Sequence, residues 1–140
     1  LAAMAGHPVW GMTESLDLTR HVQCWWLAFG PEAIASARFA SYWESVRPSR
    51  HKWGTILAQE LTWGRELAGE RGPGCVAPVS RHRCRRNPLF FAWRELISEH
   101  GVPFVKRSLF SHNYDRIDMS GWRDFLANTC PDYPLDLVTG

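Results

Sequence analysis

The spacing of hydrophobic positions along the chain changes between that of strands and that of helices. A short apolar run at residues 8–12 predicts a strand, which delivers the polar residues 13–15 to its exit. A second apolar run, at residues 21–29, is rich in aromatic residues and closes at a Gly-Pro pair, which predicts a buried strand. Ligands of open α/β sheets bind at strand exits, so a site is expected near residues 13–15.

Four further stretches repeat their apolar residues at helical spacing. Pro31 and Glu32 favour a helix start, because proline suits the first turn and a carboxylate there complements the helix dipole. Asn87 is expected to cap a later helix that Gly101 ends. The predicted helices cover residues 31–46, 52–67, 88–100 and 120–128. Residues 69–86 carry Gly-Pro-Gly and a basic run, which predicts a surface loop, so the chain is predicted to be α/β and rich in helix.

Length and composition fit one globular domain. The chain has 140 residues, of which 45% are hydrophobic and 21% charged, so we treat residues 1–140 as a single domain. The four cysteines form no CxxC pair, and no apolar run approaches the ~20 residues that span a bilayer. We therefore expect reduced cysteines and a cytoplasmic location. The chain starts with Leu1 rather than methionine, which predicts a piece of a longer protein.

The net charge of +2 is too small for a dedicated nucleic-acid binder, so no nucleic-acid partner is expected. The basic run RHRCRR, with Arg81 and Arg86 at its ends, is most simply a solvated loop. A loop of this charge can also bind an anionic membrane surface. Peripheral contact with the inner face of the membrane therefore remains open.

The order of several segments resembles the rhamnan synthesis protein F family. The segments are VWGMTES, HVQCWWLAF, RFASYWESV, KWGTILAQELTWGREL, NPLFFAWRELI and GVPFVKRSLF, and the resemblance covers residues 9–137. Cys24, Trp25 and Trp26 stand where that family usually shows Ser, Tyr and Phe. These differences keep the aromatic bulk but remove the serine hydroxyl.

The resemblance implies a GT-A-like glycosyltransferase that moves a hexose such as rhamnose from a nucleotide sugar to a lipid-linked or polysaccharide acceptor. In such folds an Asp-x-Asp turn often holds the donor and a divalent metal, Mg or Mn. No Asp-x-Asp occurs here, so no metal ligand is assigned and the donor-binding half is expected to lie outside this chain. The chain is then the C-terminal, acceptor-side part of the domain and is expected to be inactive alone. The alternative is a non-catalytic carbohydrate- or anion-binding module that uses residues 81–86.

Glu60 is the candidate catalytic residue. It interrupts an otherwise apolar helical stripe, so its carboxylate should be partly withdrawn from water. An inverting glycosyl transfer needs one general base to take the proton of the acceptor hydroxyl. The competing interpretation is a structural glutamate paired with an arginine.

Five further residues are candidates for substrate binding. His21 and Gln23 alternate along the second predicted strand and so share one face, where they either reach substrate or form a buried polar pair. Lys106 and Arg107 interrupt an apolar segment, and one of them is expected to face a cleft and stabilise a leaving diphosphate. A side chain that extends to the surface is the alternative. Glu14, at the strand exit, either contacts acceptor hydroxyls or is an ordinary acidic turn residue.

Overall fold

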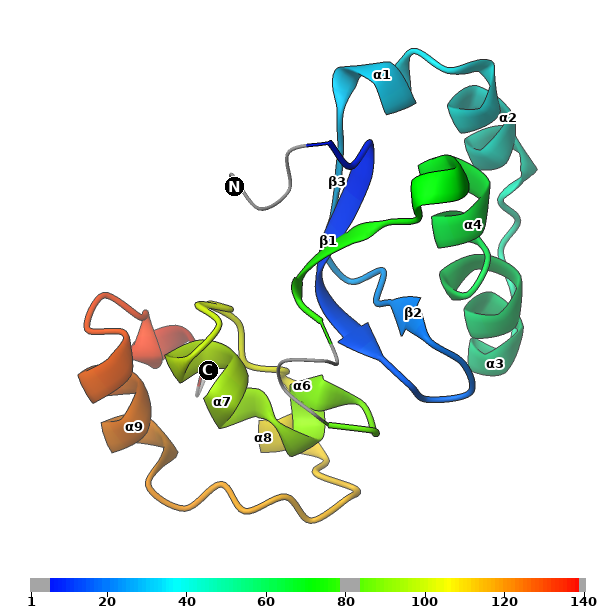
Figure 1. Cartoon of the computed structure of the whole chain (residues 1–140). Coiled ribbons are helices and arrows are strands. Elements are labelled where there is room, and N and C mark those ends of the chain that lie inside the picture. Colours follow the sequence, from blue (N-terminus) through cyan, green and yellow to red (C-terminus); the bar gives the residue numbers. More distant parts are fainter. Residues whose placement is uncertain (1–5, 79–83, 139–140) are drawn as a thin grey trace.

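The computed structural model describes residues 6–78 and 84–138 and has two lobes (Figure 1). One lobe holds a four-stranded sheet covered by α1 to α4, and the other holds α6 to α9. This arrangement confirms the predicted α/β class. The central strand β1 (Val9–Ser15) is antiparallel to β2 (His21–Val22) and β3 (Leu27–Phe29) and parallel to β4 (Gly74–Ala77).

The prediction of one continuous strand over residues 21–29 is wrong. Val22 pairs with Glu14, and Leu27 pairs with Gly11. Four residues of the second segment therefore face two residues of β1, and the two extra residues form a turn between β2 and β3. An insertion of this kind is a β-bulge, which bends a strand and redirects its side chains.

The sheet differs from the prediction in two further places. In both, pairing with a distant segment determines the structure. Residues 13–15 belong to β1 rather than to a strand exit, because Glu14 and Ser15 pair with β2. β4 lies in the segment predicted to be a loop, and it pairs with β1 from Gly74 to Ala77. A four-residue strand is too short to show the alternation that identifies strands in a sequence.

The helices of the sheet lobe lie in the predicted regions, but both predicted helices are divided, the one over residues 52–67 by a π-helical turn and the turn at residues 61–62. The predicted helix over residues 31–46 is divided because the side chain of Ser36 accepts a hydrogen bond from the Phe39 amide and starts a new helix. The elements are α1 (Pro31–Ile34), α2 (Ala37–Ser45), α3 (Lys52–Thr55), a π-helical turn (Ile56–Glu60), α4 (Trp63–Ala68) and a short 3₁₀ turn (Gly69–Arg71).

The helical lobe begins where the sequence predicted. The side chain of Asn87 accepts a hydrogen bond from the Leu89 amide and caps the first helix, and Gly101 has a φ of +63° just past the end of the second. Both predicted signals are confirmed, but the single helix predicted over residues 88–100 is divided at Ala92, whose φ of −129° is not helical. The elements are α6 (Pro88–Phe91), α7 (Trp93–Ser98), α8 (Ser108–Ser111), α9 (Trp122–Thr129) and a 3₁₀ turn (Leu135–Val138).

Three apolar clusters form the core of the protein. The first lies between β1 and α4, around Val9 and Trp63, and the third lies among α7, α8 and α9, around Trp93 and Leu126. The second joins the lobes, because it combines residues of the sheet with residues of α6 and α7. Its buried members are Ala77, Leu89, Leu96 and Val102. No helix among the described residues is both long and apolar enough to cross a membrane.

Candidate functional site

A cavity of about 530 Å³ lies where the sheet lobe meets the start of the helical lobe. Its walls come from the β1–β2 connection, the β2–β3 turn, α3 with its π-helical extension, and α6. A volume of this size is typical of small-molecule sites. The lining residues are Ser15, Asp17, Leu18, His21, Gln23, Cys24, Trp25, Lys52, Trp53, Ile56, Glu60, Asn87, Leu89, Phe90 and Lys106.

Four of the six predicted site residues line this cavity: His21, Gln23, Glu60 and Lys106. They come from separate segments of the chain, and a sequence does not show how such segments meet. The structure therefore brings together the predicted general base, the predicted cation and the predicted polar strand face. The roles assigned to these residues stay predictions.

The bulge after β2 explains why neighbours of Gln23 also line the cavity. A regular strand turns successive side chains to opposite faces, so Cys24 was expected to face away from Gln23. Instead Gln23, Cys24 and Trp25 all line the same space, because the two extra residues break the alternation. The sequence analysis missed Cys24 and Trp25, since no local signal marks an insertion of this kind.

A buried threonine fixes the orientation of two lining residues. The Thr13 hydroxyl donates to Oε1 of Gln23 over 2.8 Å and accepts from Nε1 of Trp25, also over 2.8 Å. Thr13 is fully buried and Gln23 is 4% exposed. Since a buried polar group left unpaired is costly, this chain of bonds holds the wall of the cavity in one arrangement.

Glu60 ends the π-helical turn, in which the Leu61 amide donates to the carbonyl of Ile56 over 3.0 Å. Turns of this type are rare and occur often at functional sites. Oε1 of Glu60 lies 3.9 Å from Nε2 of His21. The side chains of His21 and Glu60 are 10% and 20% exposed, so the carboxylate and the imidazole meet in a space largely shielded from solvent.

Lys106 supplies a positive charge to the same cavity. Its Nζ lies 4.5 Å from the centre of the Phe90 ring, a cation–π contact that favours the charged form. Burial lowers the pKa of Lys106, and the positive charge of Lys52 lowers it further. Glu60 and Cys24 oppose this shift. Partial desolvation strengthens the attraction between this ammonium group and an anion.

Cys24 lies close to Glu60; part of its surface is exposed, and the pKa of its thiol is raised. Burial raises the pKa of the Cys24 thiol to about 11, and the negative charge of Glu60 contributes to the rise. The reactive form of a cysteine is the thiolate. At neutral pH Cys24 therefore offers a small polar surface to a ligand rather than a nucleophile.

The two remaining predicted residues lie elsewhere. Glu14 is 6% exposed, and its carboxylate accepts hydrogen bonds from Nε of Arg20 at 2.7 Å and from a terminal nitrogen of Arg20 at 3.3 Å. Arg107 precedes α8 and lines a different cavity of about 540 Å³, together with Tyr133 and Asp136. Both residues of the pair at 106 and 107 thus line a cavity, and Lys106 shares its cavity with Glu60.

The cavity does not fit the divalent metal that the resemblance allows. Its lining contains two carboxylates, Asp17 and Glu60, and they belong to no group of three metal-ligating side chains. Among residues 6–78 and 84–138, the single group of that kind lies at the end of α7. The described residues of this cavity therefore offer no set of three ligands to a metal ion.

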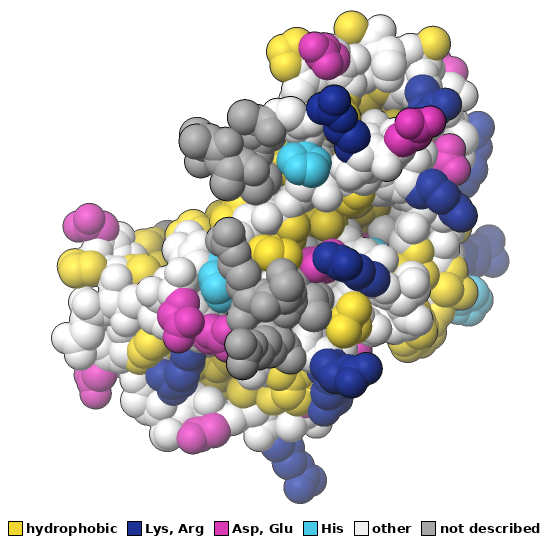
Figure 2. Space-filling model, viewed as in Figure 1, with side chains coloured by type: hydrophobic (Ala, Val, Ile, Leu, Met, Phe, Trp, Pro, Cys, Tyr) yellow, Lys and Arg dark blue, Asp and Glu magenta, His cyan; other side chains and the backbone are white. Residues whose placement is uncertain are grey.

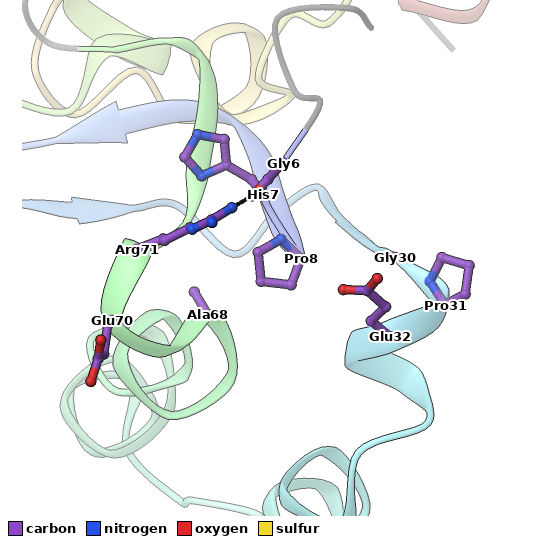
Figure 3. Close-up of a pocket in the computed structure, with 9 residues that line it drawn as sticks. All are labelled: Gly6, His7, Pro8, Gly30, Pro31, Glu32, Ala68, Glu70 and Arg71. Carbon is purple, nitrogen blue, oxygen red and sulfur yellow. Dashed lines mark hydrogen bonds between the residues drawn. The ribbon is translucent and has the colours of Figure 1, made fainter.

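A larger cavity of about 840 Å³ lies where β1, α1 and the end of α4 meet (Figure 3). Arg71 reaches across it, and its guanidinium donates to the carbonyl of Gly6. Glu32 and Glu70 also line it, but none of the predicted site residues does. Figure 2 shows hydrophobic side chains along the hollow between the two lobes. Because the 530 Å³ cavity is lined by Glu60, His21 and Lys106 together with the buried Gln23, we assign the candidate site there.

The basic run at residues 81–86 is described only in part, and Arg81, His82 and Arg83 lie outside the described residues. At its end, a terminal nitrogen of Arg86 lies 3.0 Å from Oδ1 of Asp115. The same guanidinium lies 3.7 Å from the centre of the Phe91 ring. Arg86 is thus engaged within the protein.

Comparison with protein families matched residues 6–140 to the family described as rhamnan synthesis protein F. Comparison with curated proteins and with solved structures gave no significant match.

Proposed function

Since the chain belongs to the rhamnan synthesis protein F family, which places it in polysaccharide biosynthesis, we propose that it takes part in transfer of a hexose, rhamnose in the first instance, from a nucleotide sugar to a growing glycan. The observation that supports this reaction is the shared cavity of Glu60, His21 and Lys106. It combines a shielded base with a cation, and displacement of a diphosphate by a hydroxyl needs both.

Glu60 is the general base of this proposal. As the acceptor oxygen forms its bond to the anomeric carbon, the hydroxyl proton passes to the Glu60 carboxylate. The bond from the anomeric carbon to the diphosphate oxygen breaks at the same time, and its electron pair leaves with the nucleoside diphosphate. His21 lies beside this base, with Nε2 at 3.9 Å from Oε1 of Glu60, and its protonated form pairs with the carboxylate by charge.

Lys106 faces the charge that develops on the departing diphosphate. A preorganised cation in a partly desolvated site stabilises this charge more than water does, because the group is already in place. Lys52 lines the same cavity and adds a second positive charge. Donor nucleotide contacts beyond these two lysines belong, in this proposal, to the GT-A-like half expected outside this chain.

The remaining lining residues suit a sugar ring. Trp25 and Trp53 offer flat apolar surfaces on which the carbon face of a sugar can stack, and the side-chain amide of Gln23 can bond hydroxyl groups. Trp53 is 62% exposed and stands at the rim, where an incoming glycan would meet it. A lipid-linked acceptor fits the proposal and would bring the protein to the inner face of the membrane.

The test is transfer by the full-length protein that contains this chain. Nucleotide-activated hexoses, including dTDP-rhamnose, are supplied with a glycan acceptor, and both nucleoside diphosphate release and glycan extension are measured. The proposal expects both in the wild type and loss of both in Glu60→Gln. Transfer that is unchanged in Glu60→Gln would overturn the role of this cavity.

A further inference from the structure

A second cluster of chemically active side chains lies at the end of α7, apart from the cavity described above. Glu95 and Glu99 are four residues apart, so they lie on the same helical face one turn from each other, and His100 follows directly. One ligand atom from each of the three side chains can be chosen so that all lie within 4.8 Å of one another. None of the three lines the 530 Å³ cavity.

The imidazole of His100 has a buried, unpaired nitrogen at this cluster. Its side chain is 10% exposed, and its Nε2 is fully buried with no hydrogen-bond partner among the described residues. Oε1 of Glu95 lies 3.7 Å from this nitrogen, too far for a hydrogen bond. Buried polar atoms are almost always paired. A ligand bound between Nε2 of His100 and Oε1 of Glu95 would give both atoms a partner.

The charges around the cluster favour a cation. Two glutamates at this spacing repel each other, and neither forms an ion pair with a lysine or arginine within residues 6–78 and 84–138. The adjacent Arg94 is directed elsewhere, since it stacks on Trp93 and donates to the carbonyl of Ser120. The carbonyl end of α7 adds partial negative charge at the same place.

We propose that Glu95, Glu99 and His100 form a binding site for a divalent first-row transition metal such as Zn²⁺ or Mn²⁺. Imidazole nitrogen distinguishes these ions from Mg²⁺ and Ca²⁺, which prefer all-oxygen sites. An ion bound to Nε2 of His100 and to both carboxylates satisfies the unpaired nitrogen and cancels the repulsion of the glutamates. Three protein ligands leave further coordination positions for water.

The first experiment measures Zn²⁺ binding by calorimetry on the purified chain. Wild type is expected to take up one equivalent, and Glu99→Gln and His100→Gln are expected to weaken that uptake at least tenfold. Glu99 is exposed, so its substitution should leave folding intact. Glu44→Gln and His112→Gln, both at exposed positions away from the cluster, are the matched controls and should bind as wild type does. Mg²⁺ should bind at least tenfold more weakly than Zn²⁺.

A second measurement needs no variant. Titration with Mn²⁺ should broaden the NMR signals of the His100 imidazole before those of His21 and His112, since a paramagnetic ion acts over short distances. Absence of saturable Zn²⁺ uptake, equal uptake by Glu99→Gln and wild type, or broadening that spares His100 would each overturn the site. In that case His100 would be explained by its long ion pair with Glu95.

Discussion

Nε2 of His21 lies 3.9 Å from Oε1 of Glu60, so the first residue of β2 meets the last residue of the π-helical turn inside the cavity. The contact joins two elements that lie far apart in the sequence. The π-helical turn sets the direction of Glu60, and pairing of β2 with β1 sets that of His21. The relationship therefore depends on packing of the α3–α4 region against the sheet.

Replacement of Glu60 by glutamine should abolish transfer while the protein stays folded. The amide keeps the size of the side chain but cannot accept the proton, and loss of a general base typically costs about 10²–10⁴ in rate. Single-turnover transfer measures the effect. Glu66→Gln, on the exposed side of α4, is the control and should retain wild-type rates. A kcat for Glu60→Gln within threefold of wild type would show that Glu60 is structural.

Lys106 and Arg107 are neighbours in sequence that the structure separates, because only Lys106 lines the cavity with Glu60. Lys106→Met should lower the rate by about 10²–10³, the usual cost of one lost preorganised group. Arg107→Met should stay within threefold of wild type. A steady-state assay with a nucleotide sugar distinguishes them, and equal losses in both variants would contradict the separation.

The pH dependence of transfer should report the environment of Lys106. Burial lowers the pKa of Lys106, so its positive charge is present below that lowered pKa and is lost at a lower pH than for an ordinary lysine. The alkaline fall in kcat should therefore begin below the usual lysine range. Lys106→Arg keeps its charge at all accessible pH values, so its alkaline fall should move upward. An unchanged pH profile in Lys106→Arg would assign the fall to another group.

Local patterns predicted the helical lobe well and the sheet poorly, for a physical reason. Asn87 and Gly101 act within one or two turns of their own position, so the sequence alone predicts the ends of that helical region. The bulge between Val22 and Leu27 depends on pairing with β1, a distant segment. The residues of the bulge therefore do not predict its position by themselves.

The residues of the candidate site also fall into those that a local signal predicted and those that depend on distant pairing. Glu60 and Lys106 were predicted because each is a charge that interrupts an apolar pattern, which is a local signal. Cys24 and Trp25 were missed because the bulge directs them into the cavity. Glu14 was placed at a strand exit, but the structure pairs it with Arg20, and that contact depends on the shape of the β1–β2 connection.

Cys24 should react slowly with iodoacetamide at neutral pH. Burial, followed by the charge of Glu60, raises the pKa of this thiol to about 11, so little thiolate forms below pH 9. In Glu60→Gln the negative neighbour is removed, the pKa of Cys24 should fall, and alkylation should begin at lower pH. Mass spectrometry of the Cys24 peptide over a pH series follows the reaction. An identical profile in wild type and Glu60→Gln would contradict the contact between these residues.

Thr13→Val tests whether the buried hydroxyl organises the cavity wall. Valine has nearly the same shape but neither donates to Gln23 nor accepts from Trp25, so two polar atoms lose the partners they have at 2.8 Å. Each buried group left unpaired costs about 1–3 kcal/mol, and we expect the free energy of unfolding to fall by about 2 kcal/mol or more. Urea denaturation measures this change, and Thr55→Val, at an exposed position in α3, controls for the loss of a hydroxyl.

Because Trp25 lines the cavity, its fluorescence should also change in the folded Thr13→Val protein, and ligand affinity should fall with it. Equal stability of Thr13→Val and wild type would mean that Gln23 and Trp25 find other partners, and that the wall of the cavity is not fixed by Thr13.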